Sequence, residues 1–284
     1  MDNEVIIKIL DLKKQYGRIF ALNGINLKIF KGELFAYLGP NGAGKTTTIR
    51  ILTGLTKKSS GEVWLNGYNI DTHSREAKSQ FGLVPQSINL DMELSVKENL
   101  DIHGRLYGLS SKERKKRIEQ VLEYVEMLDH INTLVKRLSG GMKRRIVIAR
   151  ALMHNPSILF LDEPTVGLDA KIRRRIWAII KKIQQQGTTI FLTTHYIEEA
   201  EFLAQRVAFL DKGRIVTIDS PQKIIQKVGN WALDFLENNK LKTIYFKERE
   251  DAKKYILTHS GSFSLRRVNL EDAFLKLTGK KVQC

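Results

Sequence analysis

The chain has 284 residues, 42% of them hydrophobic and 27% charged, and a formal net charge of +16. This composition is typical of a globular protein, and no stretch reaches the eighteen or so consecutive apolar residues that a membrane-spanning helix needs. The first four residues are partly acidic and do not resemble a secretory signal, so we expect a cytoplasmic protein. The one cysteine, Cys284, excludes an internal disulfide and is expected to be a terminal thiol without a role.

The excess of basic residues leaves several classes of partner open, namely nucleic acid, anionic lipid headgroups and the phosphates of a nucleotide. Three basic runs lie in segments with helical character, at residues 114–117, 143–145 and 173–175. We interpret most of these side chains as the solvated faces of helices.

Strands and helices are predicted to alternate along the first 220 residues, as in an α/β protein. A strand at 33–38 is followed by a helix at 45–55, and strands at 62–65 and 81–84 are separated by a turn at Asn66-Gly67. From 95 to about 155 the pattern is helical. One apolar face has helical spacing, and it consists of Ile118, Val121, Leu122, Val125 and Leu128.

The second half continues with a buried parallel strand at 157–161 and a long helix at 170–186 that Gly187 ends. Strands follow at 188–193, 207–210 and 214–217. Beyond residue 221 we predict strands at 243–247 and 263–268 and helices at 251–257 and 270–277. The expected organisation is an α/β domain over 1–220, a helical subdomain inserted at about 95–155, and a small α+β appendage over 221–284.

A phosphate-binding loop is predicted between the strand at 33–38 and the helix that follows. Residues 39–46 read Gly-Pro-Asn-Gly-Ala-Gly-Lys-Thr and fit the pattern G-x-x-x-x-G-K-[ST] in its required strand-to-helix context. Glycines let backbone N–H groups and the helix N-terminus surround phosphate oxygens. Lys45 is expected to reach the β- and γ-phosphates, and the Thr46 hydroxyl to help hold Mg²⁺.

Two carboxylates end the apolar strand at 157–161, where ligands bind in open α/β sheets. Asp162 is expected to orient Mg²⁺, and Glu163 to polarise the water that attacks the γ-phosphate. Phosphoryl transfer depends mainly on positioning and charge neutralisation, so a metal-holding acid beside a water-orienting acid predicts hydrolysis.

A third motif, Leu138-Ser139-Gly140-Gly141-Met142, precedes another helical run. Together with the two nucleotide motifs, it makes residues 5–220 resemble the ABC-transporter ATPases. The resemblance implies a P-loop NTPase fold of the ABC ATPase type with an inserted helical subdomain and, for this chain, a small C-terminal appendage.

The resemblance also implies roles for single residues. Tyr16 matches the aromatic residue that stacks on adenine, Gln86 the glutamine that touches Mg²⁺, and His195 the histidine that contacts the γ-phosphate. Ser139 begins the signature loop, which covers the γ-phosphate held by a second subunit, and Asp169 lies in the loop that crosses between subunits. The expected catalytic residues are Lys45, Glu163 and His195, and the expected metal ligands are Thr46, Gln86 and Asp162. The expected nucleotide-binding residues are Tyr16, Gly39, Pro40, Asn41, Gly42, Ala43, Gly44, Lys45, Thr46, Thr47, Gln86, Ser139, Gly140, Gly141, Asp162 and Asp169.

Two positions depart from the common family pattern. Met142 stands where many members have Gln, and Val166 where many have Ser. Both variants, and the tail at 270–279, are similar to bacterial exporters of the drug-resistance and nodulation type.

The sequence therefore predicts an ATPase that energises a membrane exporter, with ATP and Mg²⁺ as cofactors. Its expected partners are an integral-membrane permease, docking near residues 86–95, and a second ATPase subunit, identical or different. Nucleic acid is not an expected partner, and the expected location is the inner face of the cell membrane. Two alternatives are a soluble ABC-type ATPase acting on nucleic acid or ribosomes and a nucleotide sensor without turnover. A single cassette without coiled-coil or zinc-hook inserts argues against the first, and the presence of Glu163 and His195 argues against the second.

Overall fold

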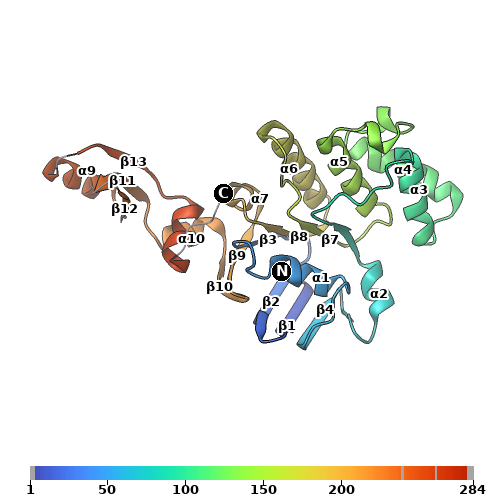
Figure 1. The fold of residues 1–284 in the computed structure, drawn as a ribbon, viewed down its shortest axis with the longest axis horizontal. Helices are drawn as coiled ribbons and strands as arrows, with labels where there is room; N and C mark the ends of the chain where they lie inside the picture. The colour runs from blue at the N-terminus through green and yellow to red at the C-terminus, as the bar shows by residue number, and fades with distance from the viewer. Residues whose placement is uncertain (1–3, 238–239, 260, 280–284) are drawn as a thin grey trace.

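The computed structural model describes residues 4–237, 240–259 and 261–279. A six-stranded sheet forms the centre of the main body (Figure 1). Its strand order is β10 (Arg214–Asp219), β9 (Arg206–Asp211), β3 (Leu34–Leu38), β8 (Thr189–Thr194), β7 (Ile158–Asp162) and β6 (Phe81–Val84). All neighbours pair in parallel except β9 and β10, so the expected α/β class is confirmed. The expected strands at 33–38, 81–84, 157–161, 188–193, 207–210 and 214–217 all occur, with ends shifted by a few residues.

A second sheet is antiparallel, and most of it was not predicted. Its order is β2 (Ile19–Phe30), β1 (Val5–Tyr16), β4 (Ser60–Leu65) and β5 (Tyr68–Asn69). Only β4 had been expected. The turn after β4 is formed as predicted, because Asn66 and Gly67 both have positive φ, 48° and 83°.

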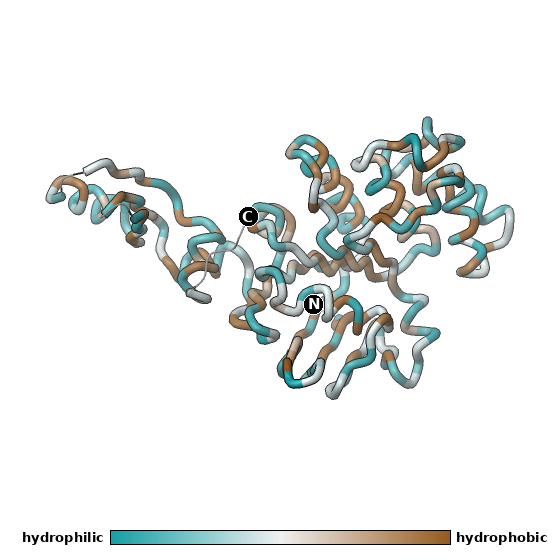
Figure 2. Tube along the Cα trace, in the orientation of Figure 1, coloured by the Kyte–Doolittle hydropathy of each residue, from teal (hydrophilic) through white to brown (hydrophobic). Residues whose placement is uncertain are grey.

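The hydrophobic core lies on both faces of the six-stranded sheet, which is why its strands carry the most hydrophobic part of the trace (Figure 2). Alternate residues of β3 point to opposite sides. Leu34 and Leu38 belong to the cluster on the helical side, whereas Phe35 and Tyr37 belong to the cluster shared with β1 and β2. Both faces of β3 and β7 are buried, so these strands read as continuous apolar runs.

Helices cover the central sheet and extend beyond one end of it (Figure 1). The expected helix at 45–55 is α1 (Lys45–Leu52), and the expected helix at 170–186 is α6 (Ala170–Gln185). Two short helices, α2 (Ser74–Ser79) and α7 (Ile197–Leu203), were not predicted. The helical region contains α3 (Val96–Leu106), α4 (Ser111–Tyr124) and α5 (Gly140–Ala151). None of the helices in the described ranges has the length and hydropathy needed to cross a bilayer.

Two expectations for the helical region were wrong. Leu128 does not extend the apolar face of α4, because that helix ends at Tyr124 and Leu128 is 42% exposed in a following 3₁₀ turn. The basic run at 143–145 is not a solvated face either. Arg144 and Arg145 are buried, and both donate hydrogen bonds to backbone carbonyl oxygens.

The C-terminal region begins with α8 (Pro221–Gln226) and contains a three-stranded sheet, β12 (Lys240–Phe246), β11 (Trp231–Glu237) and β13 (Phe263–Arg267). The helices are α9 (Arg249–Thr258) and α10 (Leu270–Thr278); α8 and β11 were not predicted. Phe274 of α10 packs edge-on against Phe209 of β9, with ring centroids 5.1 Å apart. We propose a domain boundary near residue 221, with α10 attaching the appendage to the main sheet. Cys284 lies outside the described residues.

Candidate functional site

The loop between β3 and α1 is built for close approach of a ligand to the backbone. Gly44 has φ of 112° and caps α1 without any side-chain hydrogen bond, so the first N–H groups of the helix have no side-chain partner there. A Cβ at Gly44 would lie 2.6 Å from the carbonyl oxygen of Ala21. Both the backbone conformation and the space therefore require glycine. The loop thus ends at a helix N-terminus, where the sequence predicted an anion site.

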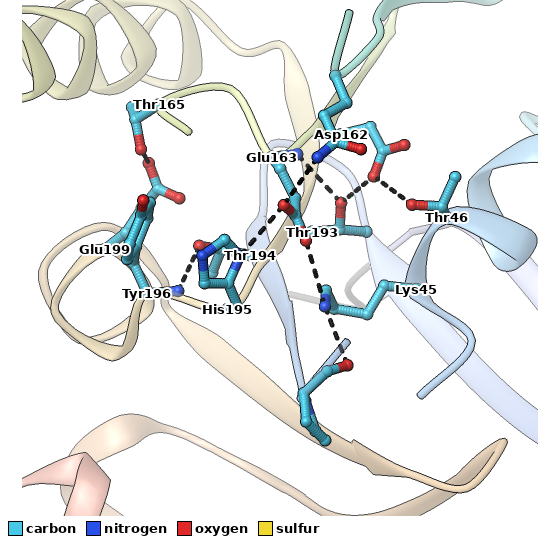
Figure 3. A network of polar contacts seen from close by, with 12 residues as sticks. Lys45, Thr46, Asp162, Glu163, Thr165, Thr193, Thr194, His195, Tyr196 and Glu199 are labelled. Atoms are coloured by element: carbon cyan, nitrogen blue, oxygen red, sulfur yellow. Dashed lines mark hydrogen bonds and ion pairs between the residues drawn. The ribbon is translucent and has the colours of Figure 1, made fainter. Parts of the chain in front are cut away.

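The side chain of Lys45 lies inside this loop. It is 4% exposed, and its Nζ donates to the carbonyl oxygens of Gly39 at 2.8 Å and Pro40 at 3.2 Å. The same atom lies 3.2 Å from Oε1 of Glu163, at the end of β7 (Figure 3). A buried cation is thus shared between the loop and the carboxylate that was expected to act as the base.

Asp162, the last residue of β7, is held by two hydroxyl groups. Its Oδ1 accepts from Thr193 Oγ1 at 2.6 Å and from Thr46 Oγ1 at 3.2 Å (Figure 3). Burial raises the pKa of the Asp162 carboxyl, and these two hydrogen bonds oppose the rise. Thr46 and Asp162 were both expected to hold a metal, and the structure places them in direct contact.

Glu163 occupies a strained position between several polar side chains. Its φ is 49°, a left-handed conformation that is unfavourable for a residue other than glycine. The backbone N–H donates to the carbonyl oxygen of Thr193 at 3.0 Å. Its Oε2 accepts from Gln86 Nε2 at 3.3 Å and lies 3.1 Å from Nδ1 of His195, although that last contact is not aligned as a hydrogen bond. Such backbone strain costs free energy and is concentrated at functional sites in proteins.

Two adjoining cavities open at this edge of the sheet. The first has a volume of about 360 Å³ and is lined by Ala21, Asn41, Gly42, Gly44, Lys45, Thr46, Thr47, Gln86 and Glu163. The second, of about 440 Å³, is lined by the three expected metal ligands together with Ile49, Arg50, Leu55, Leu83, Pro85 and Ser87. Thr46 and Gln86 line both. The structure therefore brings the phosphate loop, the strand-end acids and Gln86 to one place.

The signature residues and Asp169 form a separate group. Ser139 caps α5 by accepting from the Met142 N–H at 3.3 Å, and Asp169 caps α6 by accepting from the Ile172 N–H at 2.9 Å. A Cβ at Gly141 would lie 2.6 Å from Cγ2 of Ile172, so these two helix starts are in contact. In this chain both polar side chains act as helix caps.

Tyr16 stands at the end of β1 and is 51% exposed. The Nζ of Lys14 lies 4.7 Å above its ring. The ring is thus accessible for stacking, which is the role that the resemblance implied for Tyr16.

Sequence reasoning missed two residues that support the site. Thr193 holds Asp162 and the Glu163 backbone, yet a threonine in a β-branched strand carries no signal of this. Arg144 donates to the carbonyl oxygens of Pro85 and Gln86 at 2.6 Å each. Arg144 was missed because it lies in the basic run at 143–145, which the sequence indicated as a solvated helix face.

Comparison with known proteins agrees with this geometry. The model of the ABC transporter family matches residues 22–166. The Nod factor export ATP-binding protein I of Cupriavidus pinatubonensis (strain JMP 134 / LMG 1197) is 39% identical over an alignment of 299 positions. The alignment covers 98% of this chain and 92% of that protein. The linearmycin resistance ATP-binding protein LnrL of Bacillus subtilis (strain 168) is 42% identical over 219 residues, which cover 77% of this chain and 70% of that protein.

Solved structures give the same result. An ATP-binding subunit of an ABC transporter superposes with a TM-score of 0.71 at 27% identity, covering 78% of this chain and 92% of that one. The dimeric post-hydrolysis state of the cassette MJ0796, bound to ADP and Pi, superposes with a TM-score of 0.68 at 32% identity. The match covers 76% of this chain and 98% of that one. The chain therefore belongs to the ABC transporter family, as an ATP-binding and ATP-hydrolysing subunit.

Proposed function

We propose that this chain hydrolyses ATP in order to drive export through a membrane permease. The observation that carries the proposal is the position of Glu163, which lines the phosphate-loop cavity and contacts Lys45, Gln86 and His195. The names of the relatives, which refer to export and to resistance, support export. These relatives match most of the chain, which favours a transport role over a soluble ATPase acting on nucleic acid.

ATP would bind with its phosphates in the loop between β3 and α1. Backbone N–H groups at the start of α1 would donate to phosphate oxygens, and the Lys45 ammonium would neutralise part of their charge. Lys45 now lies 3.2 Å from Glu163. A bound triphosphate would compete with Glu163 for this cation and thereby release the carboxylate for its role as a base.

The residues present fit a magnesium ion. Thr46, Gln86 and Asp162 all line the cavity of about 440 Å³. Together they offer hydroxyl, amide and carboxylate oxygens, the donors that Mg²⁺ prefers. Gln86 directs its amide nitrogen to Glu163, which leaves the amide oxygen for a cation. When bound, Mg²⁺ would neutralise charge that develops on the phosphate oxygens.

In the proposed reaction Glu163 orients a water molecule towards the γ-phosphate and takes up its proton. His195 lies on the other side of Glu163 and would contact the γ-phosphate. Both residues stand at the ends of neighbouring parallel strands, β7 and β8, so the sheet itself fixes their separation.

A second ATPase subunit would complete the site. Ser139, Gly140 and Gly141 start α5, and we propose that they cover the γ-phosphate held by the opposite subunit, with Asp169 crossing beside them. The comparison structures include dimeric cassettes, which supports this arrangement. Both helix starts are exposed, at Ser139 and Gly140 for α5 and at Asp169 for α6, and the space around Gly140 is open.

The permease would dock near residues 86–95, which run from Gln86 to the start of α3. This segment contacts the catalytic glutamate at one end and the helical region at the other. It is therefore placed to transmit the state of the γ-phosphate. We propose a peripheral location on the cytoplasmic face of the membrane, held there by the permease.

Purification from solubilised membranes tests this function. Tagged chain carrying Glu163→Gln should retain a polytopic membrane protein, and the wild-type complex in lipid should hydrolyse ATP faster than the isolated chain. A cysteine at Asn89 should cross-link to a loop of that partner. Recovery of ribosomes or nucleic acid in place of a membrane protein would contradict the proposal.

A further inference from the structure

A second carboxylate, that of Glu199, is buried close to the site but belongs to none of the motifs. Glu199 lies on α7, one turn after the loop that carries His195, and its exposed fraction is 0%. A fully buried acid is costly unless it is hydrogen-bonded, so its partners indicate what it does.

The partners of Glu199 come from two other elements. Its Oε1 accepts from the hydroxyl of Thr165 at 2.7 Å and from the indole Nε1 of Trp177 at 2.9 Å. Thr165 lies two residues after Glu163, and Trp177 lies on α6. Figure 3 shows the contact with Thr165 and its place beside the His195 loop. One oxygen atom thus connects three segments.

The loop from Glu163 to Asp169 consists of tight turns. The N–H of Val166 donates to the carbonyl oxygen of Glu163 at 3.3 Å, and that of Leu168 donates to Thr165 at 3.2 Å. Thr165 lies inside the turn that the first of these bonds closes, so anchoring Thr165 also restrains the left-handed backbone of Glu163. The Thr165 side chain is fully buried and directed to Glu199.

The loop that carries His195 and Tyr196 is held by contacts of its own. The N–H of Tyr196 donates to Thr194 Oγ1 at 2.9 Å, and the rings of His195 and Tyr196 are 4.2 Å apart. The guanidinium of Arg173, on α6, lies 5.1 Å from the Tyr196 ring centre. Glu199 lies on α7, the helix that begins directly after this loop.

We propose that Glu199 is a positioning residue for ATP hydrolysis: by binding Thr165 from α7, it keeps the Glu163 loop in register with the His195 loop. This inference rests on the proposed roles of Glu163 and His195. Burial raises the pKa of Glu199, while Thr194, Thr165 and Trp177 and the charge of Arg173 oppose the rise.

The test compares variants that remove one or the other donor to the same oxygen. Thr165→Val removes the donor on the catalytic loop, and Trp177→Phe removes the donor on α6. We expect Thr165→Val and Glu199→Ala to lower kcat by about ten- to hundredfold, the usual effect of a small displacement of reacting groups. KM and the Kd for ATP should change by less than about threefold, because ground-state binding is not involved.

Three controls separate positioning from folding. Trp177→Phe should lower the Tm but leave kcat within about threefold of the wild type. Glu199→Gln keeps an acceptor oxygen and should restore most of the activity lost in Glu199→Ala. Glu198→Ala, an exposed neighbour on the same helix, should behave as the wild type. The double variant of Thr165 and Glu199 should be no slower than Glu199→Ala alone, because both changes remove one interaction.

The inference is overturned if Thr165→Val turns over normally, or if Trp177→Phe loses as much kcat as Thr165→Val. If Glu199→Ala fails to fold, the Thr165 and Trp177 variants still decide. Glu163→Gln separates this test from that of the proposed function. An inert Glu163→Gln with a normal Thr165→Val rejects only the inference, whereas an active Glu163→Gln rejects the assignment of the base itself.

Discussion

The guanidinium of Arg144 donates a 2.6 Å hydrogen bond to the backbone carbonyl oxygen of Gln86. A second bond of the same length goes to Pro85. Arg144 belongs to α5, which is capped by Ser139, whereas Gln86 contacts Glu163. One buried side chain thus connects the helix of the signature motif to the loop beside Glu163.

This connection predicts a specific effect of Arg144→Lys. Lysine keeps the charge but not the planar fork that reaches two carbonyl groups. We expect kcat to fall by about tenfold and the Tm to fall by several degrees, because a buried charge loses part of its hydrogen bonding. Arg174→Lys, on the exposed side of α6, is the matched control and should change neither quantity. Steady-state ATPase assays and thermal unfolding measure both.

The Glu163→Gln variant should bind ATP and hardly hydrolyse it. Glutamine retains the size of the side chain and can still contact Gln86 and His195, but it cannot take up a proton. We expect kcat to fall by roughly 10²- to 10⁴-fold, the usual contribution of a positioned base, while the Kd for ATP stays near that of the wild type. Near-normal turnover would remove Glu163 from this role.

Lys45→Ala should act at an earlier step. The change removes the cation that lies between the phosphate loop and Glu163, so the loop has less positive charge for the triphosphate. It also leaves Glu163 buried without its ion-pair partner. We expect weaker binding of both ATP and ADP in calorimetry. Unchanged affinity would contradict the phosphate-loop assignment.

The contrast between these sites shows what could be predicted. The sequence placed residues 39–46 and the Asp162-Glu163 pair at one edge of the sheet, because each is a contiguous motif at the end of a strand. Arg144 and Glu199 were not, because their partners lie far away in sequence. Glu198 and Glu199 are identical and adjacent, yet one is exposed and the other fully buried. Only the packing of α7 against α6 and the catalytic loop distinguishes them.

Strands β1 and β2 were missed for a different reason. A strand is recognised by alternation of apolar and polar residues, and β1 breaks that pattern where its pairing register shifts between Ile9 and Leu12. Asp11, at this point, has φ of 42°. Such an irregularity changes the face on which later residues lie, so a strict period of two fails across it.

Two partly buried histidines, His103 and His154, predict that the stability of the fold depends on pH. Burial lowers the pKa of His103 to about 4, with Arg150 and His154 adding to the effect. Burial also lowers the pKa of His154 to about 4, against its contact with the carbonyl oxygen of Phe81. The unfolded chain therefore binds protons more readily between pH 6.5 and 4. Stability from these groups is complete above pH 6.5 and is lost as the pH falls through that window.

Urea unfolding at pH 7 and pH 4.5 measures this effect. The loss due to the two histidines should be on the order of 2–5 kcal/mol. Carboxylates titrate in the same range, so the informative quantity is the difference from a variant carrying His103→Gln and His154→Gln, whose pH dependence should be flatter. His73→Gln, at an exposed site, should leave the wild-type dependence unchanged. Equal slopes for the wild type and the double variant would contradict the assignment.

The last prediction concerns how two subunits share one ATP. In the proposed arrangement a single chain has only an incomplete nucleotide site, because the signature residues that would cover its γ-phosphate belong to the opposite subunit. ADP lacks that phosphate and should not support the pair. We therefore expect Glu163→Gln protein to be mostly monomeric alone or with ADP, and to shift towards a dimer with Mg-ATP, as measured by light scattering coupled to gel filtration.

The structure suggests which second change should block that shift. Ser139→Arg would place a large cation in the shared site, but it would also remove the cap of α5, at a cost of about 1 kcal/mol. Gly140→Arg avoids this loss, since a side chain added at Gly140 meets open space within the chain. Either change, in the Glu163→Gln background, should abolish the dimer while leaving the Kd of the monomer for ATP largely intact. An ATP-dependent dimer that persists in both double variants would reject the shared-site arrangement. Each variant would then tolerate a bulky cation at the place where the proposal puts the γ-phosphate held by the opposite subunit.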